Sequence, residues 1–326
     1  FHIHNTTTRM SSSHAHILDN IKQFVPALTN SLHKGQSGRI GIVGGSREYT
    51  GAPYYAAYSA LKVGADLSMI FCCEAAATPI KSYSPELIVH PVFKTSEELN
   101  TAESETEYIK KTVEKVTKWT QTLHVLVVGP GLGRDSLVLK CVKEIILNAK
   151  QSNLPIILDG DALHLVSLEP AIVQGYTAAI LTPNLNEYAR LCDAVKLDKN
   201  AQLNQVCQSL GNVTIVQKGP SDMISDGTTT IECSESGGPR RCGGQGDVLA
   251  GSVAVFYGWA SQYQKRTGKA LQTEYPVSLL AAYGACFLTR SCNRAAFYKH
   301  HRSMTTPNMI EEIGGVFESL FPTANL

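Results

Sequence analysis

Short runs of Val and Ile alternate along the chain with longer stretches in which apolar residues recur at the spacing of a helix. Parallel sheets covered by helices are typical of this alternation. Strands are predicted at residues 39–43, 66–71, 87–89, 123–128, 155–158, 178–181 and 213–217. Helices are predicted at residues 51–63, 102–119 and 137–149. A further helix is predicted between the strands at 66–71 and 87–89.

The pattern changes toward the C-terminus. Residues 223–225 and 228–232 are predicted to form a hairpin joined by Asp226-Gly227, because an Asp-Gly pair supplies the positive φ angles of a tight turn. Helices are then expected at residues 244–259, 277–298 and 308–320. We therefore predict an α/β fold with one doubly wound, mostly parallel sheet and an antiparallel edge. Such sheets bind ligands beyond the carboxyl ends of their strands.

Composition narrows the class of protein. The 326 residues include 43% hydrophobic side chains, which predicts a globular chain with a large core. Lys and Arg number 29 against 28 Asp and Glu, so the formal net charge is +1. Because nucleic acids and anionic membrane surfaces attract a basic excess, we expect neither as a partner. The apolar runs are also too short for a membrane span.

The N-terminal residues differ from the rest of the chain. Residues 1–16 contain runs of Thr and Ser, one Arg and no acidic residue, so a flexible segment is expected there. It could be a transit-peptide stub, an alternative start or a cloning remnant. Residues 17–326 are expected to form a single domain. The nine cysteines show no metal-binding spacing, which predicts reduced thiols and a cytoplasmic or mitochondrial location.

Two glycine-rich segments follow predicted strands near the start of the sheet. Residues 41–46 lack the G-x-G-x-x-G spacing of a dinucleotide site, so a close-packed turn is the competing interpretation. Residues 129–133 alternate glycine with Pro130 and Leu132. Alternating glycines let a ligand lie against bare backbone, although they also suit a simple turn.

A third segment, residues 182–187, pairs an amide with a carboxylate. Pro183 ends the preceding strand and Asn184 is suited to cap a helix. Asn184 and Glu187 would then project from the first helical turn, where they could hold a hydrated Mg²⁺. The alternative is a capping box, in which Glu187 bonds back to the cap residue. The segment alone leaves both open.

The fourth segment, residues 240–247, leads directly into an apolar helix. Gly243, Gly244 and Gly246 allow consecutive N–H groups to converge, and a helix N-terminus adds positive potential, so a phosphate site is predicted. Asp247 would lie at its rim. An acid there is either a partner for the helix dipole or a general base aimed at a hydroxyl that attacks a phosphoryl group.

Together these motifs resemble the ribokinase-like superfamily: Gly-Gly-Gln-Gly-Asp at 243–247, Thr-Pro-Asn-x-x-Glu at 182–187, and the segment from His33 to Pro53. Within it, the chain is most similar to the ATP-dependent NAD(P)H-hydrate dehydratases. Segments 49–53, 81–86, 127–134 and 216–219 carry this closer resemblance, and the likeness extends over nearly the whole chain. It implies a ribokinase-like, three-layer α/β/α fold.

The resemblance also implies a reaction. ATP phosphorylates the C6 hydroxyl of the (S)-hydrated nicotinamide ring, and phosphate then leaves, which restores NADH or NADPH. In this reaction Asp247 takes the hydroxyl proton, and the backbone N–H groups of residues 244–246 stabilise the transferring phosphoryl group. The resemblance places Mg²⁺ near Asn184 and Glu187, held largely through water.

Binding surfaces are implied by position in the same motifs. The surface for the hydrated dinucleotide comprises Gly131, Gly133, Asn184, Leu185, Asn186, Glu187, Tyr188, Ala189, Arg190 and Asp247. The ATP-binding surface comprises Lys218, Gly219, Pro220, Ser221 and Asp222, with Arg240, Arg241, Cys242, Gly243, Gly244, Gln245 and Gly246 over the phosphates. Tyr49, Tyr54 and Tyr83 could stack on a ring or be ordinary packing residues.

Two other functions are compatible with the same sequence. One is a small-molecule kinase that releases a stable phosphorylated product, and the other is a dinucleotide-binding protein without catalysis. The sequence leaves open whether the phosphoryl donor is ATP or ADP, and whether the preferred substrate is the hydrate of NADH or that of NADPH. It also leaves the oligomeric state open, and a homo-oligomer is one of the alternatives. In each case the expected partners are small anions.

Overall fold

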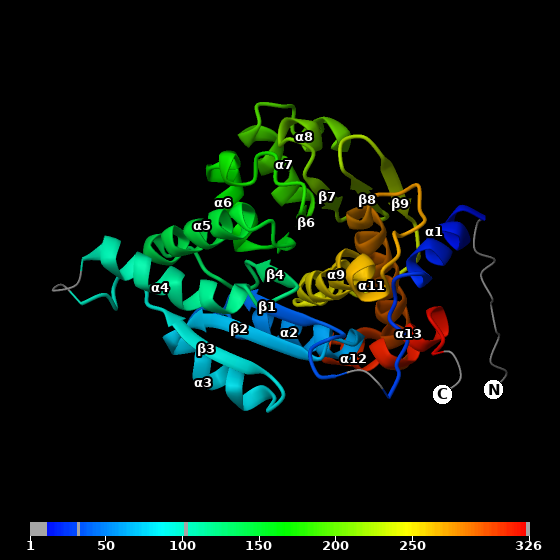
Figure 1. Cartoon of the computed structure of the whole chain (residues 1–326), viewed down its shortest axis with the longest axis horizontal. Helices are drawn as coiled ribbons and strands as arrows, with labels where there is room; N and C mark the ends of the chain where they lie inside the picture. The colour runs from blue at the N-terminus through cyan, green and yellow to red at the C-terminus, as the bar shows by residue number, and fades with distance from the viewer. Residues whose placement is uncertain (1–11, 31–32, 101–103, 324–326) are drawn as a thin grey trace.

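A nine-stranded sheet forms the middle layer of the protein, with helices on both of its faces (Figure 1). The computed structural model describes residues 12–30, 33–100 and 104–323. The strand order is β3-β2-β1-β4-β5-β6-β7-β8-β9. Strands β3 to β7 are parallel, whereas β7, β8 and β9 pair antiparallel. The predicted doubly wound, three-layer α/β/α fold with an antiparallel edge is therefore confirmed.

The strands are β1 (Arg39–Val43), β2 (Leu67–Cys73), β3 (Ile88–Phe93), β4 (Val125–Val128), β5 (Ile156–Leu158), β6 (Ala179–Leu181), β7 (Thr214–Gln217), β8 (Asp222–Ser225) and β9 (Thr230–Cys233). The helices are α1 (Ser12–Lys22), α2 (Gly51–Val63), α3 (Glu74–Tyr83), α4 (Glu105–Thr120), α5 (Ser136–Gln151), α6 (Asp161–Leu168), α7 (Leu185–Ala194), α8 (Leu203–Ser209), α9 (Gln245–Ser261), α10 (Tyr263–Thr267), α11 (Val277–His300), α12 (Thr306–Glu311) and α13 (Ile313–Leu320). Two short 3₁₀ helices cover Pro170–Ile172 and His301–Ser303.

The predicted two-residue hairpin turn was wrong. Strand β8 ends at Ser225, which pairs with Thr230, so the loop contains four residues. A carboxylate oxygen of Asp226 accepts hydrogen bonds from the backbone N–H groups of Thr228 (2.9 Å) and Thr229 (2.8 Å). This side chain-to-backbone turn keeps Thr228 and Thr229 out of the strand. Gly227 has a φ of 90°, as expected for its place in a turn.

Differences at the two chain ends are smaller. The helix expected at 308–320 is two helices, α12 and α13, which are separated at residue 312. Glycines 314 and 315, which are poor helix formers, lie in the first turn of α13. Residues 1–11 of the expected N-terminal segment lie outside the described residues, whereas residues 12–16 belong to α1. All nine cysteines are unpaired. No helix in the described part of the chain combines the length and the apolar character that crossing a membrane requires.

Alternation along the central strands creates the two halves of the core. In β4, Val125 and Val127 face one side with α2, α9 and α11, while Leu126 and Val128 face the other side with α4 and α5. Helix α9 is buried almost all round, and a Cβ atom at Gly251 would collide with the backbone oxygen of Ala56 in α2. This close approach fixes the N-terminus of α9 beside the carboxyl ends of the strands.

Candidate functional site

Asp159 lies at the centre of the carboxyl edge of the sheet. It directly follows β5, is 4% exposed, and accepts a hydrogen bond from the Thr182 hydroxyl (2.8 Å) after β6. The same carboxylate oxygen binds the Lys218 ammonium (2.9 Å) after β7. Sequence reasoning missed Asp159, although an acid immediately after a buried strand was a signal that could have identified it.

Lys218 is held close to several acidic groups. Its backbone N–H donates to the oxygen of Pro183 (2.9 Å), which ties the end of β7 to the end of β6. Burial disfavours its charge, but the carboxylates of Asp159 and Glu187 outweigh this effect and raise the pKa of the ammonium. The acidic neighbours of Lys218 therefore favour its charged form at this edge.

Asp247 lies in the first turn of α9, as predicted. Burial, and then the nearby Asp159 carboxylate, raise the pKa of Asp247 well above its usual range, although Lys218 partly opposes the shift. A Cβ atom at Gly246 would lie 3.4 Å from Lys218 Nζ and 3.8 Å from the second carboxylate oxygen of Asp159. The glycine loop thus packs directly against the Asp159–Lys218 ion pair.

The cap residue of α9 is Gly244. It has a φ of 95°, and a Cβ atom there would lie 2.6 Å from the Tyr55 ring and 3.0 Å from the Thr306 hydroxyl. Gly243 precedes it in open space, since a Cβ atom there would meet nothing within 4 Å. Backbone N–H groups at this helix start have no intrahelical acceptors, so the segment can bind an anion.

The capping box is present at the start of α7. The Asn184 amide oxygen accepts from the N–H groups of Asn186 and Glu187 (both 3.0 Å), and a Glu187 carboxylate oxygen accepts from the N–H of Asn184 (2.8 Å). Burial raises the pKa of Glu187, while Lys218 lowers it. Because two donors already occupy the Asn184 oxygen, this amide is poorly suited to bind a metal directly.

The side chains near the start of α7 determine how Mg²⁺, which the family resemblance implies, could be held there. Among residues 12–30, 33–100 and 104–323, no group of three or more His, Cys, Asp or Glu side chains is placed to hold a metal ion. Glu187 uses one carboxylate oxygen in the cap. The carboxylates of Glu187 and the neighbouring Asp159 suit a Mg²⁺ ion that keeps most of its water molecules and is held mainly by the phosphates of a bound ligand.

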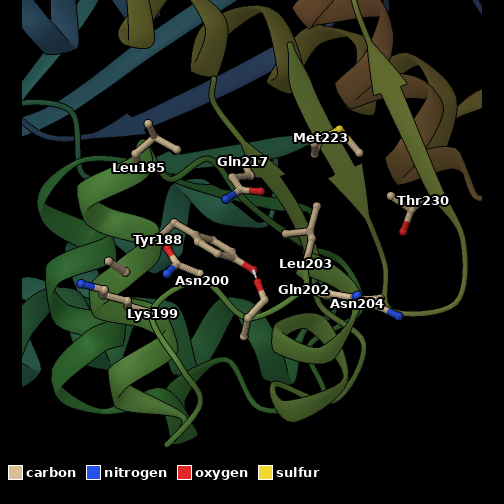
Figure 2. Close-up of a pocket in the computed structure, with 12 residues that line it drawn as sticks. Leu185, Tyr188, Lys199, Asn200, Gln202, Leu203, Asn204, Gln217, Met223 and Thr230 are labelled. Carbon is tan, nitrogen blue, oxygen red and sulfur yellow. Dashed lines mark hydrogen bonds between the residues drawn. The ribbon is translucent and has the colours of Figure 1, made fainter. Parts of the chain in front are cut away.

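Part of the predicted substrate surface faces a cavity of about 620 Å³. Figure 2 shows Leu185 and Tyr188 from α7 on one side and Gln217 and Met223 from strands β7 and β8 on the other. Ala189 also lines this cavity. Tyr188 is buried and donates its hydroxyl to the oxygen of Ala201 (2.8 Å), so it supports the wall. Asn186 and Arg190 are exposed on α7.

The glycine loop after β4 adjoins Asp159. A Cβ atom at Gly129 would collide with the backbone oxygen of Asp159, and one at Gly131 would lie 2.7 Å from the oxygen of Tyr49. The N–H of Gly133 donates to Asp161 (2.9 Å), which also binds Arg134 (3.2 Å). The predicted residues Gly131 and Gly133 therefore allow backbone segments to approach closely at this edge.

The three candidate stacking tyrosines differ in environment. Tyr54 is half-buried, stacks on Tyr58 (centroids 5.3 Å apart) and meets the edge of Tyr83 (5.3 Å). Tyr49 and Tyr83 are 60% and 45% exposed. The Tyr83 hydroxyl also forms a hydrogen bond with the Thr50 hydroxyl (2.7 Å). Tyr54 is thus a packing residue, whereas Tyr49 and Tyr83 keep surface that a ring can cover.

A second cavity, of about 350 Å³, gathers much of the predicted ATP-binding surface. Its lining includes Asn184, Lys218, Gly219, Asp222, Arg241, Gln245 and Gly246. The other predicted ATP-binding residues, namely Pro220, Ser221, Arg240, Cys242, Gly243 and Gly244, lie in the same two loops but not in its lining. Leu249, Thr289, Arg290, Asn293 and Met309, with Gly237, complete the wall and were not predicted.

Asp222 has a structural partner in this wall. Its carboxylate binds the Arg290 guanidinium in a two-point ion pair, at 2.6 and 2.7 Å, and both side chains are largely buried. The same carboxylate accepts from the N–H of Gly219 (3.2 Å). Asp222 therefore shapes the loop that follows β7 and does not face a ligand as a free charge.

Known proteins share both the sequence and the fold. Residues 40–314 match the family model described as NAD(P)H-hydrate dehydratase. The chain is 50% identical over 309 residues to the ATP-dependent (S)-NAD(P)H-hydrate dehydratase of Rattus norvegicus, covering 93% of this chain and 85% of that protein.

Solved structures resemble the fold. A ribokinase-like superfamily protein from Enterococcus faecalis superposes with a TM-score of 0.73 at 20% identity, covering 94% of this chain and 95% of that one. The ADP/ATP-dependent NAD(P)H-hydrate dehydratase from Bacillus subtilis, co-crystallized with ATP/Mg²⁺, gives 0.64 at 17% identity, covering 93% and 97%. The architecture is therefore ribokinase-like, and from the match over most of its length the chain belongs to the NAD(P)H-hydrate dehydratase family.

Proposed function

We propose that the protein dehydrates the (S)-hydrates of NADH and NADPH at the expense of ATP, releasing NAD(P)H, ADP and phosphate. The observation that carries this proposal is the position of Asp247, in the first turn of α9, beside Lys218 and Asp159 and next to a glycine loop. The 50% identity to a relative named as an ATP-dependent (S)-NAD(P)H-hydrate dehydratase supports the same reaction.

Asp247 is the proposed general base. Its carboxylate accepts the proton of the C6 hydroxyl while the hydroxyl oxygen bonds to the γ-phosphorus of ATP and ADP departs. The raised pKa makes Asp247 a stronger base than an exposed carboxylate. The C6–O bond of this phosphate ester then breaks and inorganic phosphate leaves, driven by the ring nitrogen's lone pair, and the adjacent ring carbon loses a proton to restore the double bond.

The proposed phosphate contacts come from backbone and one side chain. The N–H groups of residues 244–246 at the start of α9 stabilise negative charge on the transferring phosphoryl group. Lys218, fixed by Asp159, adds a positive charge in the adjoining cavity. These groups explain how a protein of net charge +1 can concentrate positive potential where anionic ligands bind.

Mg²⁺ is proposed as the metal of this reaction. When bound to the nucleotide phosphates, it would neutralise part of their charge. Glu187 would hold it through water, with Asp159 nearby, because both offer carboxylate oxygens beside Lys218. Asn184 would act indirectly, since its amide oxygen fixes the first turn of α7 and thereby the position of Glu187.

The proposed dinucleotide surface combines Gly131 and Gly133 with α7. Leu185 and Ala189 offer apolar surface in the larger cavity, and the exposed Asn186 and Arg190 offer polar groups beside it. We also propose a single domain over residues 17–326. The nine unpaired cysteines support a reducing compartment, the cytoplasm or the mitochondrial matrix.

A direct assay tests the function. Purified protein is incubated with (S)-hydrated NADH, ATP and Mg²⁺, and the recovery of reduced-nicotinamide absorbance is followed together with the release of inorganic phosphate. Recovery that requires ATP, with one phosphate released per NADH, is expected. A stable phosphorylated product would instead identify a kinase, and nucleotide binding without ATP consumption would identify a binding protein.

A further inference from the structure

One buried side chain ties the glycine loop before α9 to the C-terminal part of the chain. Thr306, the first residue of α12, is 1% exposed. Its hydroxyl donates to the backbone oxygen of Gly243 at 2.6 Å and lies 3.6 Å from the Cys242 sulfur. Thr306 does not belong to the motifs that carry the family resemblance. The structure therefore brings a residue from a separate element against the proposed phosphate site.

This hydrogen bond determines the direction of a neighbouring backbone donor. Gly243 and Gly244 share a trans peptide group, in which the C=O and N–H bonds point in opposite directions. Because Thr306 holds the Gly243 oxygen, the N–H of Gly244 points away from Thr306. In the described part of the chain, the backbone N–H groups of residues 244–246 have no acceptor, so all three are available to an anion.

The loop itself does little to maintain this direction. The peptide has glycine on both sides, and it can turn over by rotation about ψ of Gly243 and φ of Gly244. The φ of Gly244 is 95°, and after such a rotation it would be negative, which glycine adopts as readily. The Gly243 oxygen would then point where the Gly244 N–H points now. Its partial negative charge would repel a phosphoryl group.

The other hydrogen bonds of the loop do not fix this peptide. Arg240 Nε donates to the oxygen of Met304 at 3.5 Å, and the Gln245 amide donates to the oxygen of Arg240 at 3.2 Å. Both bonds hold the loop outside the Gly243–Gly244 peptide. Within residues 12–30, 33–100 and 104–323, the Gly243 oxygen accepts from the Thr306 hydroxyl and from no other group.

We propose that Thr306 is a positioning residue for phosphoryl transfer. By holding the Gly243 oxygen, it keeps the Gly244 N–H directed at the phosphoryl group as that group moves from ATP to the hydrate. This inference rests on the proposed function, in which the N–H groups of residues 244–246 stabilise that group. Such donors act on charge that develops during transfer, so loss of one lowers kcat more than it weakens substrate binding.

Thr306→Val and Thr306→Ser separate the hydroxyl from the shape of the side chain. Valine removes the hydroxyl and keeps nearly the same shape, so kcat with (S)-hydrated NADH and ATP should fall at least about tenfold. KM for each substrate should change by less than about threefold. Serine keeps the donor and should restore kcat to within about threefold of the wild type. Thr306→Ala, which also lacks the hydroxyl, replaces the valine variant if valine prevents folding.

A mimic of the transferring group gives a second measurement. Calorimetry with Mg²⁺, ADP and aluminium fluoride should show at least about tenfold weaker binding to Thr306→Val than to the wild type. Binding of ADP with Mg²⁺ alone should change by less than about threefold, because ADP lacks the group that the Gly244 N–H contacts. A general loosening of the fold would weaken both complexes alike.

Thr214→Val is the matched control. Thr214 is also 1% exposed, and its hydroxyl forms a hydrogen bond with the Ser278 hydroxyl at 2.8 Å. It begins β7, at the edge of the sheet opposite the site. The valine variant should therefore lose a buried hydrogen bond and some stability, as Thr306→Val does, but it should keep the wild-type kcat.

Two results would overturn the inference and leave the proposed function intact. One is a folded Thr306→Val variant whose kcat and affinity for the ADP–aluminium fluoride complex match those of Thr214→Val. The other is an equal loss of kcat in the valine and serine variants, which would show that shape and not the hydroxyl matters. A wild type that does not dehydrate the hydrate with ATP would overturn the proposed function and this inference together.

Discussion

The ammonium of Lys218 lies 2.9 Å from a carboxylate oxygen of Asp159, although the two residues follow strands that are separated by β6. Thr182, which follows β6, donates to the same oxygen at 2.8 Å. Three consecutive strands thus end in one hydrogen-bonded group, against which Gly246 and Asp247 pack. This arrangement places a cation, an acid and a helix N-terminus together and provides the basis for the predictions below.

Asp247→Asn should nearly abolish turnover. Asparagine keeps the shape of the side chain but cannot take a proton, so kcat should fall by about 10²- to 10⁴-fold. Circular dichroism and calorimetric ATP binding should show that the fold and the nucleotide site persist. Substantial activity in this variant would remove Asp247 from its role as base.

The same substitution should stabilise the protein. Because the pKa of Asp247 is raised in the folded state, its contribution favours folding at low pH and is lost as pH rises through the folded pKa. Above the pKa of the unfolded state the Asp247 side chain therefore opposes folding, and at neutral pH Asp247→Asn should raise the free energy of unfolding by about 1 kcal/mol or more. Urea unfolding at several pH values measures this, and the gain should shrink toward acid pH.

Asp159→Asn should shift the pH dependence of catalysis. The Asp159 carboxylate helps to raise the pKa of Asp247, so its removal should lower that pKa and move the acidic limb of the kcat/KM profile to lower pH. Asp161→Asn is the matched control, because Asp161 binds Gly133 and Arg134 instead. An acidic limb that stays in place in Asp159→Asn would contradict the proposed coupling.

The sequence predicted the layers of the fold better than the residues of the site. The bounds of β1 and α2 agree with the structure, because each lies between clear turn signals. The strand before Asp159 was predicted, but Asp159 was missed because its importance depends on Lys218 and Thr182, which are distant in sequence. The family motifs identified Asp247 and Lys218 as candidate site residues, and the roles of both residues stay predictions.

Helix α11 illustrates a second limit. Its 24 residues have a helical pattern that was predicted, but nothing in that pattern distinguishes Arg290 or Asn293 from ordinary partly buried residues. Their meaning comes from Asp222 and Gly238, which reach them from other parts of the fold. The hairpin turn failed for a related reason, since the Asp226 side chain, and not the Asp-Gly pair alone, determines the loop.

Arg290→Lys should weaken both the fold and the ATP site. Lysine cannot make the five contacts of the guanidinium, and it leaves the buried Asp222 carboxylate less well paired. We expect a loss of about 2–4 kcal/mol in the free energy of unfolding and a raised KM for ATP. Lys143, a partly exposed cation on α5 that pairs with Glu169, offers the control: Lys143→Ala should change stability by less than about 1 kcal/mol.

Gly244→Ala and Gly243→Ala should have opposite outcomes although the residues are neighbours. At Gly244 the φ of 95° and the approach to Tyr55 and Thr306 both oppose a side chain, so alanine should cost at least about 1–2 kcal/mol of stability and displace the start of α9. At Gly243 a Cβ atom enters open space. Gly243→Ala should therefore fold normally, and thermal unfolding of the two variants side by side would show the difference. Equal stability of both variants would contradict a left-handed cap at Gly244, because the cost of alanine follows directly from that conformation.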